Sequence, residues 1–214
     1  MEDISRMIAG FRRFHNVYFH GDKELFDELI GGQRPKTLVI GCCDSRVDPA
    51  MITDSAPGEL FVVRNVANLV PPYEPDMAHH GISSALEYAV CDLQVQHVIV
   101  LGHSQCGGIG YLMNHEGVGD REFIGHWVGM MAAAKTEVLQ RLPGKSAEVQ
   151  QRACEQAAIL LSLDNLLTFP WLRRRAEQGT LSLHGWYFDL GCGELLSYDP
   201  HSGVFKSLVT ADAS

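Results

Sequence analysis

The chain has 214 residues, 46% of them hydrophobic and 20% charged, which is typical of a globular protein with a substantial core. Its formal net charge is −9, and nucleic-acid binding needs clustered Lys and Arg, so we expect no nucleic-acid partner. No window approaches the roughly 18 apolar residues of a membrane span. The charged opening MEDISRMIAGFRRFH lacks the apolar region of a signal peptide, so we expect a cytoplasmic protein that does not enter a membrane.

The chain begins with an amphipathic helix, whose apolar residues recur at helical spacing: Ile4, Met7, Ile8, Phe11 and Phe14. Residues 23–29 predict a second short helix. Short apolar runs rich in β-formers predict buried strands at 37–41, 60–63 and 97–101. The apolar spacing in 82–93 predicts a helix before the third strand. Strands that alternate with helices indicate an α/β fold with a mainly parallel central sheet flanked by helices.

The second half of the chain is predicted to be mainly helical from 120 to 178, with breaks at Pro143 and Pro170. Residues 181–190 predict another strand, and 194–199 could return beside it as a hairpin. No linker is long enough to separate two domains, so we expect a single domain over 1–214.

Two motifs carry the residues that suggest chemistry: GCCDSR and GHSQCGG each follow a predicted strand directly. In open parallel sheets, ligands bind beyond the carboxyl ends of the strands, so Cys42 or Cys43 is expected near His103 and Cys106. Two thiolates and one imidazole suit zinc, and three protein ligands leave its fourth position open, as in catalytic sites. Adjacent residues at a strand end point to opposite faces, so Cys42 and Cys43 cannot easily bind one ion together. The pattern alone favours neither of the two.

The other cysteines suggest no chemistry. Cys91 and Cys154 lie in helical apolar patterns and are predicted to be small buried residues. Cys192 lies between two glycines, which indicates a turn.

Asp44 and Arg46 are spaced so that a carboxylate–guanidinium pair can form beside Cys42. Such a pair could be purely structural, or Asp44 could cap a helix. Next to an open zinc position, the carboxylate could instead accept a hydrogen bond from zinc-bound water or bind the zinc itself. Arg46 would decide between these two roles by holding the carboxylate.

These motifs and their surroundings resemble the β-class carbonic anhydrases. The resemblance covers CCDSRV, PGELFVVRNVANLV, ALEYAV, HSQCGG and HGWYFD, and it extends from about residue 10 to residue 190. It implies a mainly parallel sheet flanked by helices, with C-terminal helices and an N-terminal helical arm, 1–30, that contacts a partner. The expected assembly is a homodimer or homotetramer.

The resemblance also implies the site and its reaction. One zinc ion per chain would be held by Cys42, His103 and Cys106, with Asp44 and Arg46 as the catalytic dyad. The implied reaction is reversible hydration of carbon dioxide to bicarbonate and a proton, by attack of zinc-bound hydroxide.

One branch of the family lines its substrate pocket with four residues that match Gln33, Phe61, Val66 and Tyr88 here. From the pattern alone, the last three would be core residues and Gln33 an exposed loop residue. The backbone N–H groups of Gly107 and Gly108 are further candidates for contact with substrate oxygens, because glycine permits a close approach.

Another branch has an inhibitory bicarbonate site made of a tryptophan, an arginine and a tyrosine. The matching residues here are Val39, Arg64 and Phe188, of which only the arginine is kept. We therefore expect no such inhibitory site, unless Tyr187 supplies the missing hydroxyl. We also expect an open resting site in which Asp44 is paired with Arg46.

Two alternatives remain at this point. The same zinc set could hydrolyse carbonyl sulfide or carbon disulfide. Asp44 could also close the set, as fourth ligand of a structural zinc site without catalytic activity.

Overall fold

The computed structural model describes residues 2–21, 23–76, 78–116 and 121–208, and the chain forms two compact units, 1–34 and 35–214. The first unit contains three helical segments: α1 (Glu2–His15), the π-helical η1 (Asn16–Gly21) and α2 (Lys23–Leu29). Acidic residues in the first turn of α1 and basic residues in its last turn complement the helix dipole. None of the described residues in these three segments is buried.

The second unit is built on one sheet, in which six strands of the described residues take the order β2-β1-β3-β4-β5-β6. The strands are β1 (Thr37–Cys42), β2 (Leu60–Asn65), β3 (His97–His103), β4 (Ser182–Asp189), β5 (Glu194–Asp199) and β6 (Val204–Ser207). The first four strands in this order are parallel to one another. Strand β5 is antiparallel to β4, and β6 is antiparallel to β5. The predicted α/β fold with a mainly parallel central sheet is confirmed, including the predicted hairpin return at β5.

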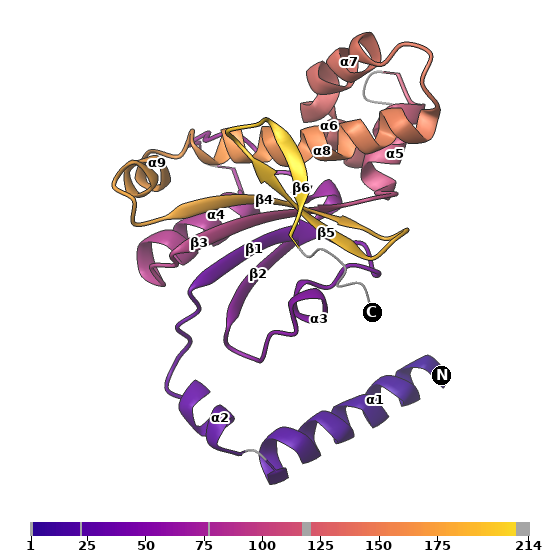
Figure 1. The fold of residues 1–214 in the computed structure, drawn as a ribbon. Helices are drawn as coiled ribbons and strands as arrows, with labels where there is room; N and C mark the ends of the chain where they lie inside the picture. The colour runs from indigo at the N-terminus through magenta and orange to yellow at the C-terminus, as the bar shows by residue number, and fades with distance from the viewer. Residues whose placement is uncertain (1, 22, 77, 117–120, 209–214) are drawn as a thin grey trace. The chain divides into compact units, whose positions relative to one another are not determined.

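Helices connect the strands: α3 (Pro49–Thr53), η2 (Val66–Asn68), α4 (Gly81–Glu87), η3 (Tyr88–Asp92), α5 (Gly107–Asn114), α6 (Ile124–Val128), η4 (Gly129–Met131), α7 (Ala132–Arg141), α8 (Ala147–Leu166) and α9 (Pro170–Glu177). Figure 1 shows α8 and α9 along one face of the sheet. Among the described helices, none is both long and apolar enough to cross a membrane.

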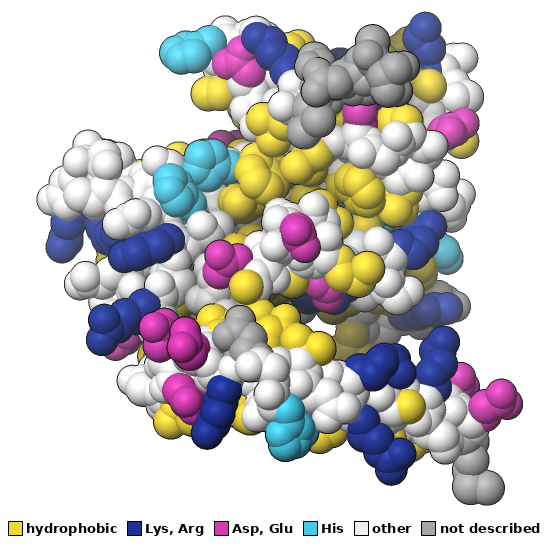
Figure 2. All heavy atoms as spheres, turned by 60° about the horizontal axis from the view of Figure 1, so that its bottom comes forward, with side chains coloured by type: hydrophobic (Ala, Val, Ile, Leu, Met, Phe, Trp, Pro, Cys, Tyr) yellow, Lys and Arg dark blue, Asp and Glu magenta, His cyan; other side chains and the backbone are white. Residues whose placement is uncertain are grey.

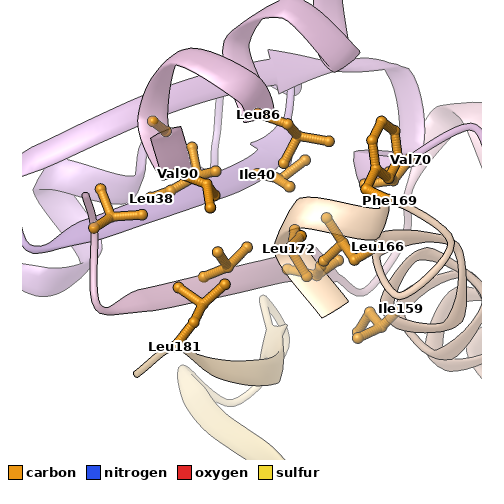
Figure 3. Close-up of a cluster of buried hydrophobic side chains, with 14 of the residues drawn as sticks. Leu38, Ile40, Val70, Leu86, Val90, Ile159, Leu166, Phe169, Leu172 and Leu181 are labelled. Atoms are coloured by element: carbon orange, nitrogen blue, oxygen red, sulfur yellow. The ribbon is translucent and has the colours of Figure 1, made fainter. Parts of the chain in front are cut away.

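The main core lies between that face of the sheet and the helices α4, α8 and α9 (Figure 3). Alternate residues of β1, Leu38 and Ile40, are fully buried there, together with Leu86 of α4, Ile159 of α8 and Phe169 just before α9. Burying a side chain of this size contributes roughly 1.5–3 kcal/mol. Val39 of the same strand is buried in a smaller cluster on the opposite face, so β1 is covered on both sides.

Helix α8 packs directly against β3 and β4, and both strands present a glycine to it. A Cβ atom added to Gly102 or to Gly185 would lie 2.8 Å from side-chain atoms of Ile159. Real Cβ atoms do not approach other atoms so closely, so larger residues would push the helix away from the sheet. The part of α8 around Ile159 is therefore held closely against β3 and β4.

Three details differ from the sequence predictions. The helix predicted over 82–93 is α-helical only to Glu87 and continues as the π-helical η3. Cys91 in that segment is exposed, so its predicted burial is wrong, whereas Cys154 is buried as predicted. The short elements α3, α5 and β6 were not predicted, because five, eight and four residues are too few to show a clear apolar period.

Candidate metal centre

The parallel pairing of β1 with β3 brings the two cysteine motifs together. Gly41 pairs with Leu101, so Cys42 and His103 lie at the same end of neighbouring strands. After His103 the chain turns sharply at Gln105, whose φ of 58° lies in the left-handed region. This turn directs Cys106 back toward Cys42, at the position just before α5.

Cys42, His103 and Cys106 form a buried cluster in which one candidate ligand atom of each residue lies within 4.8 Å of the others. The two sulfur atoms are 3.9 Å apart. Two Zn–S bonds of about 2.3 Å at a tetrahedral angle place sulfurs roughly 3.8 Å apart, so the spacing suits zinc. The neighbouring Cys43 is exposed and lies outside this cluster.

His103 presents one nitrogen that no described protein group satisfies. Its Nδ1 donates a hydrogen bond of 2.8 Å to the carbonyl oxygen of Ser104, which leaves the lone pair on Nε2. Nε2 is buried and has no hydrogen-bond partner. Since an unsatisfied buried polar atom is costly, a metal ion bound at Nε2 would remove this cost. The donor set and its geometry therefore fit zinc.

The two thiols of the cluster share a proton unequally. The hydrogen bond with Cys106 is the largest cause that lowers the pKa of Cys42 well below its usual range, while burial opposes this change. The same hydrogen bond raises the pKa of Cys106 above its usual range. Backbone N–H groups of Gly108 and Ile109 favour the Cys106 thiolate. The protein groups alone thus stabilise one thiolate, and binding of a metal to both sulfurs would release a proton.

Asp44 lies beside the cluster with both carboxylate oxygens held by Arg46. Nε of Arg46 donates to Oδ1 at 2.9 Å and Nη2 donates to Oδ2 at 2.7 Å. The backbone N–H of Arg46 adds a third bond to Oδ1, and Nη2 also donates to the carbonyl of Gln105. The hydrogen bond from the Arg46 side chain is the main reason why the pKa of Asp44 falls well below its usual range. An ionised carboxylate is therefore kept 4.0 Å from Nε2 of His103.

Arg64 holds the backbone of the same loop. Its Nε donates to the carbonyl of Cys42 at 2.9 Å, and Nη2 donates to the carbonyl of Asp44 at 2.7 Å. Its Nη1 pairs with Asp48 at 3.0 Å. From the sequence, Arg64 is predicted only as the one residue kept from the inhibitory bicarbonate site. Its contacts with backbone carbonyl groups could not be predicted, because every residue has such a group.

The residues around Arg64 do not rebuild that anion site. Val39 is buried and carries no hydrogen-bonding group, and Phe188 packs among the hydrophobic residues beside the sheet. Tyr187 is fully buried, and its hydroxyl donates to Glu155 at 2.8 Å. It therefore does not supply the hydroxyl that Phe188 lacks.

Val66 is the predicted pocket residue that the structure places beside a hollow. This hollow has a volume of about 540 Å³ and is lined almost entirely by apolar atoms from Asn65, Val66, Glu122, Phe123, Ile124, His126 and Trp127. A Cβ atom on Gly108 would lie 2.6 Å from Cγ1 of Val66, so only glycine fits there. Gly107 begins α5 and is exposed.

Phe61 and Tyr88 contact each other, with ring centroids 5.9 Å apart, but they do not lie beside the cluster of their own chain. Phe61 pairs with Leu38, at the end of β1 opposite to Cys42. Tyr88 is 46% exposed. Gln33 is exposed and belongs to the separate unit 1–34, so its predicted pocket role stays a prediction.

Comparison with known proteins gives a consistent result. A family model described as carbonic anhydrase matches residues 37–195. The chain is 38% identical over 207 residues to a carbonic anhydrase of Synechocystis, covering 96% of this chain and 74% of that protein. The solved structure of the β-carbonic anhydrase CcaA superposes with a TM-score of 0.91 at 35% identity, covering 99% and 94% of the two chains. A tetrameric β-carbonic anhydrase of Sordaria macrospora gives a TM-score of 0.80 at 27% identity, with all of both chains covered.

The adjacent cysteines provide a matched test of the metal centre. We expect Cys42→Ala, His103→Ala and Cys106→Ala to lose most bound zinc, because each removes one of the three clustered donors. Cys43→Ala should keep one zinc per chain, since Cys43 lies outside the cluster. Metal analysis of the purified proteins measures both. Full zinc content in Cys42→Ala, or its loss in Cys43→Ala alone, would reverse the assignment.

Proposed function

The chain belongs to the β-class carbonic anhydrase family, and on this premise we propose that it catalyses CO₂ + H₂O ⇌ HCO₃⁻ + H⁺ with zinc as cofactor. The observation that carries the proposal is the buried Cys42–His103–Cys106 cluster with the ionised Asp44 beside it. The alternative substrates carbonyl sulfide and carbon disulfide gain no support from the described residues.

Cys42, His103 and Cys106 would hold the zinc, one ion per chain. Zinc bound by three protein ligands supplies a Lewis acid that makes water acidic enough to react near neutral pH. The hydrogen bond from Nδ1 of His103 to Ser104 fixes the ring so that Nε2 faces the cluster.

Asp44 would accept a hydrogen bond from the attacking water and orient it toward carbon dioxide. This role requires an ionised carboxylate, and the two hydrogen bonds from Arg46 favour that form. They also hold Asp44 in place, so it is kept from moving onto the metal as a fourth ligand. We therefore propose an open site, with Asp44 and Arg46 acting as a catalytic pair rather than as structural groups.

The substrate is small and apolar, so it needs an apolar approach to the cluster. Val66, whose neighbouring hollow is almost wholly apolar, is our candidate for the wall of this approach. Gly108 would allow the chain to pack closely there, and Gly107 offers an exposed backbone N–H to substrate oxygens.

Phe61 and Tyr88 lie away from the cluster of their own chain, so we propose that they line the pocket of a second copy. A dimer or tetramer is the corresponding assembly, and the similar protein from Sordaria macrospora is tetrameric. Exposed hydrophobic side chains suit such contacts: Figure 2 shows them among charged residues on one face. The apolar stripe of α1 is our proposed dimer contact, and Gln33 our further candidate for a pocket residue. Cytoplasmic location and a single functional domain over 1–214 remain predictions.

The role of Asp44 can be tested with an isosteric change. Asp44→Asn keeps the shape but replaces an accepting oxygen with a donating amide. We expect it to keep its zinc and to lose CO₂ hydration by roughly a hundredfold or more, a typical loss for removal of a group that handles protons. Stopped-flow hydration with zinc analysis measures both quantities.

Asp54→Asn is the control for this change, because Asp54 is exposed and its φ of 50° suits asparagine. This control should retain full turnover. Near-normal turnover of Asp44→Asn would refute the proposed role of Asp44.

Bicarbonate tests the predicted lack of an inhibitory site. Nε, Nη1 and Nη2 of Arg64 each donate to Cys42, Asp48 or Asp44, and the Tyr187 hydroxyl donates to Glu155, so these two residues do not form the inhibitory anion site. We expect bicarbonate to slow hydration only as a product does, with a Hill coefficient near one. Steep, cooperative inhibition in the same stopped-flow assay would contradict this expectation.

A further inference from the structure

We propose that Glu155 is a positioning residue, whose buried carboxylate fixes the backbone of Cys106 and so sets how tightly the centre retains zinc. The inference rests on the proposed function, because it takes Cys106 as a zinc ligand. It concerns a residue that lies far from both motifs in the sequence.

The contact is direct and long-range. Oε1 of Glu155 accepts a hydrogen bond of 2.9 Å from the backbone N–H of Cys106, which lies 49 residues earlier in the chain. Cys106 precedes the first turn of α5, so the helix has no carbonyl to pair with this N–H. Cys106 is 1% exposed, and water has little access to it. Glu155 is therefore the group that satisfies the ligand's backbone.

Two further groups hold the carboxylate in one orientation. Nε2 of Gln151, one turn earlier on α8, donates to Oε1 at 2.9 Å. The hydroxyl of Tyr187, at the end of β4, donates to Oε2 at 2.8 Å. Glu155 is thus connected to α8, to β4 and to the Cys106 loop at once. Because the carboxylate is itself fixed by hydrogen bonds to Gln151 and Tyr187, it restricts the movement of the Cys106 backbone.

Glu155 is an unusual residue for a position with only 3% exposure. Among the described residues it forms no ion pair; Arg152, one turn earlier, pairs with Asp189 at 2.7 Å instead. A buried carboxylate without a cation costs stability unless hydrogen bonds compensate, and an apolar side chain would fill the space more favourably. The position is therefore better suited to holding the loop than to packing alone.

The expected effect is on the retention of metal. With Glu155 in place, the Cys106 sulfur lies 3.9 Å from that of Cys42, the spacing that suits a shared zinc ion. Without the Glu155 carboxylate, the backbone N–H of Cys106 would lack its acceptor, and the turn at Gln105 would change its conformation. Groups that orient metal ligands typically change metal affinity by about 10–100-fold when removed. A cavity of about 490 Å³ borders Glu155 and Gln151, so the surroundings can adapt to a changed side chain.

Two substitutions distinguish the role of the Glu155 carboxylate as a hydrogen-bond acceptor from the role of the side chain in filling space. Glu155→Met keeps an unbranched side chain of similar size but offers no acceptor to Cys106. Glu155→Gln retains one oxygen for the Cys106 N–H, while its amide can donate to the hydroxyl oxygen of Tyr187. Cys154→Ala is the matched control, because Cys154 is the buried neighbour on the same helix and is not one of the three clustered donors.

The measurement is the rate at which the zinc-loaded full chain releases zinc to excess chelator, with thermal unfolding followed in parallel. We expect Glu155→Met to release zinc about tenfold faster or more, and Glu155→Gln and Cys154→Ala to stay near the wild-type rate. Cobalt substitution gives a second readout: the thiolate-to-cobalt absorption bands should shift in Glu155→Met alone. Equal release rates and bands in Glu155→Met and Cys154→Ala would overturn the proposal.

Two further variants keep the result interpretable. If Glu155→Met does not fold, Tyr187→Phe frees one carboxylate oxygen while keeping the ring, and it should also release zinc faster; a wild-type rate would then overturn the inference. If Cys106→Ala retains zinc, the proposed function itself fails. Loss of zinc in Cys106→Ala with wild-type release in the Glu155 variant would refute this inference alone.

Discussion

The parallel pairing of β1 with β3 is the constraint on which the site depends. Its register, with Gly41 beside Leu101, brings two segments about 60 residues apart to the same end of the sheet. A slip by one residue would turn every side chain of a strand to the other face and separate the three donors. The register is fixed because β1 is buried on both faces, so Leu38 and Val39 each have only one place to pack.

The two loops beyond these strands are held by opposite kinds of group. Cations hold the first loop: Arg46 binds the Asp44 carboxylate, and Arg64 binds the carbonyls on either side of Cys43. An anion holds the second, where Glu155 accepts from the N–H of Cys106. In both loops the backbone or side chain beside a proposed ligand is fixed before any metal binds. Such preorganisation reduces the ordering that metal binding must impose.

The sequence predicts the sheet and the cluster well, because both follow from apolar periods and from motifs that end strands. The residue pattern leaves Cys42 and Cys43 undecided, and the family resemblance implies Cys42. The structure shows that Cys42 lies with His103 and Cys106 while Cys43 is exposed. The roles of Arg64 and Glu155 could not be predicted from residue patterns, since their partners are backbone groups 22 and 49 residues away.

The exposure of Cys91 could not be predicted either, because the change from α4 to the π-helical η3 leaves no clear period. The register of β1 and β2 also separates Phe61 from the cluster, because it pairs Phe61 with Leu38, at the end of β1 opposite to Cys42. Tyr88 contacts Phe61 and so lies away from the cluster as well. A family resemblance assigns a residue to a pocket, but it does not say from which copy of the chain the residue comes.

The most direct test of the account is CO₂ hydration by the purified full chain, measured by stopped flow near neutral pH on samples whose zinc content is known. The account predicts hydration that rises in proportion to bound zinc, up to one ion per chain. A chain with a full complement of zinc and no hydration would contradict it, and would indicate a site closed by Asp44 or one that acts on carbonyl sulfide or carbon disulfide.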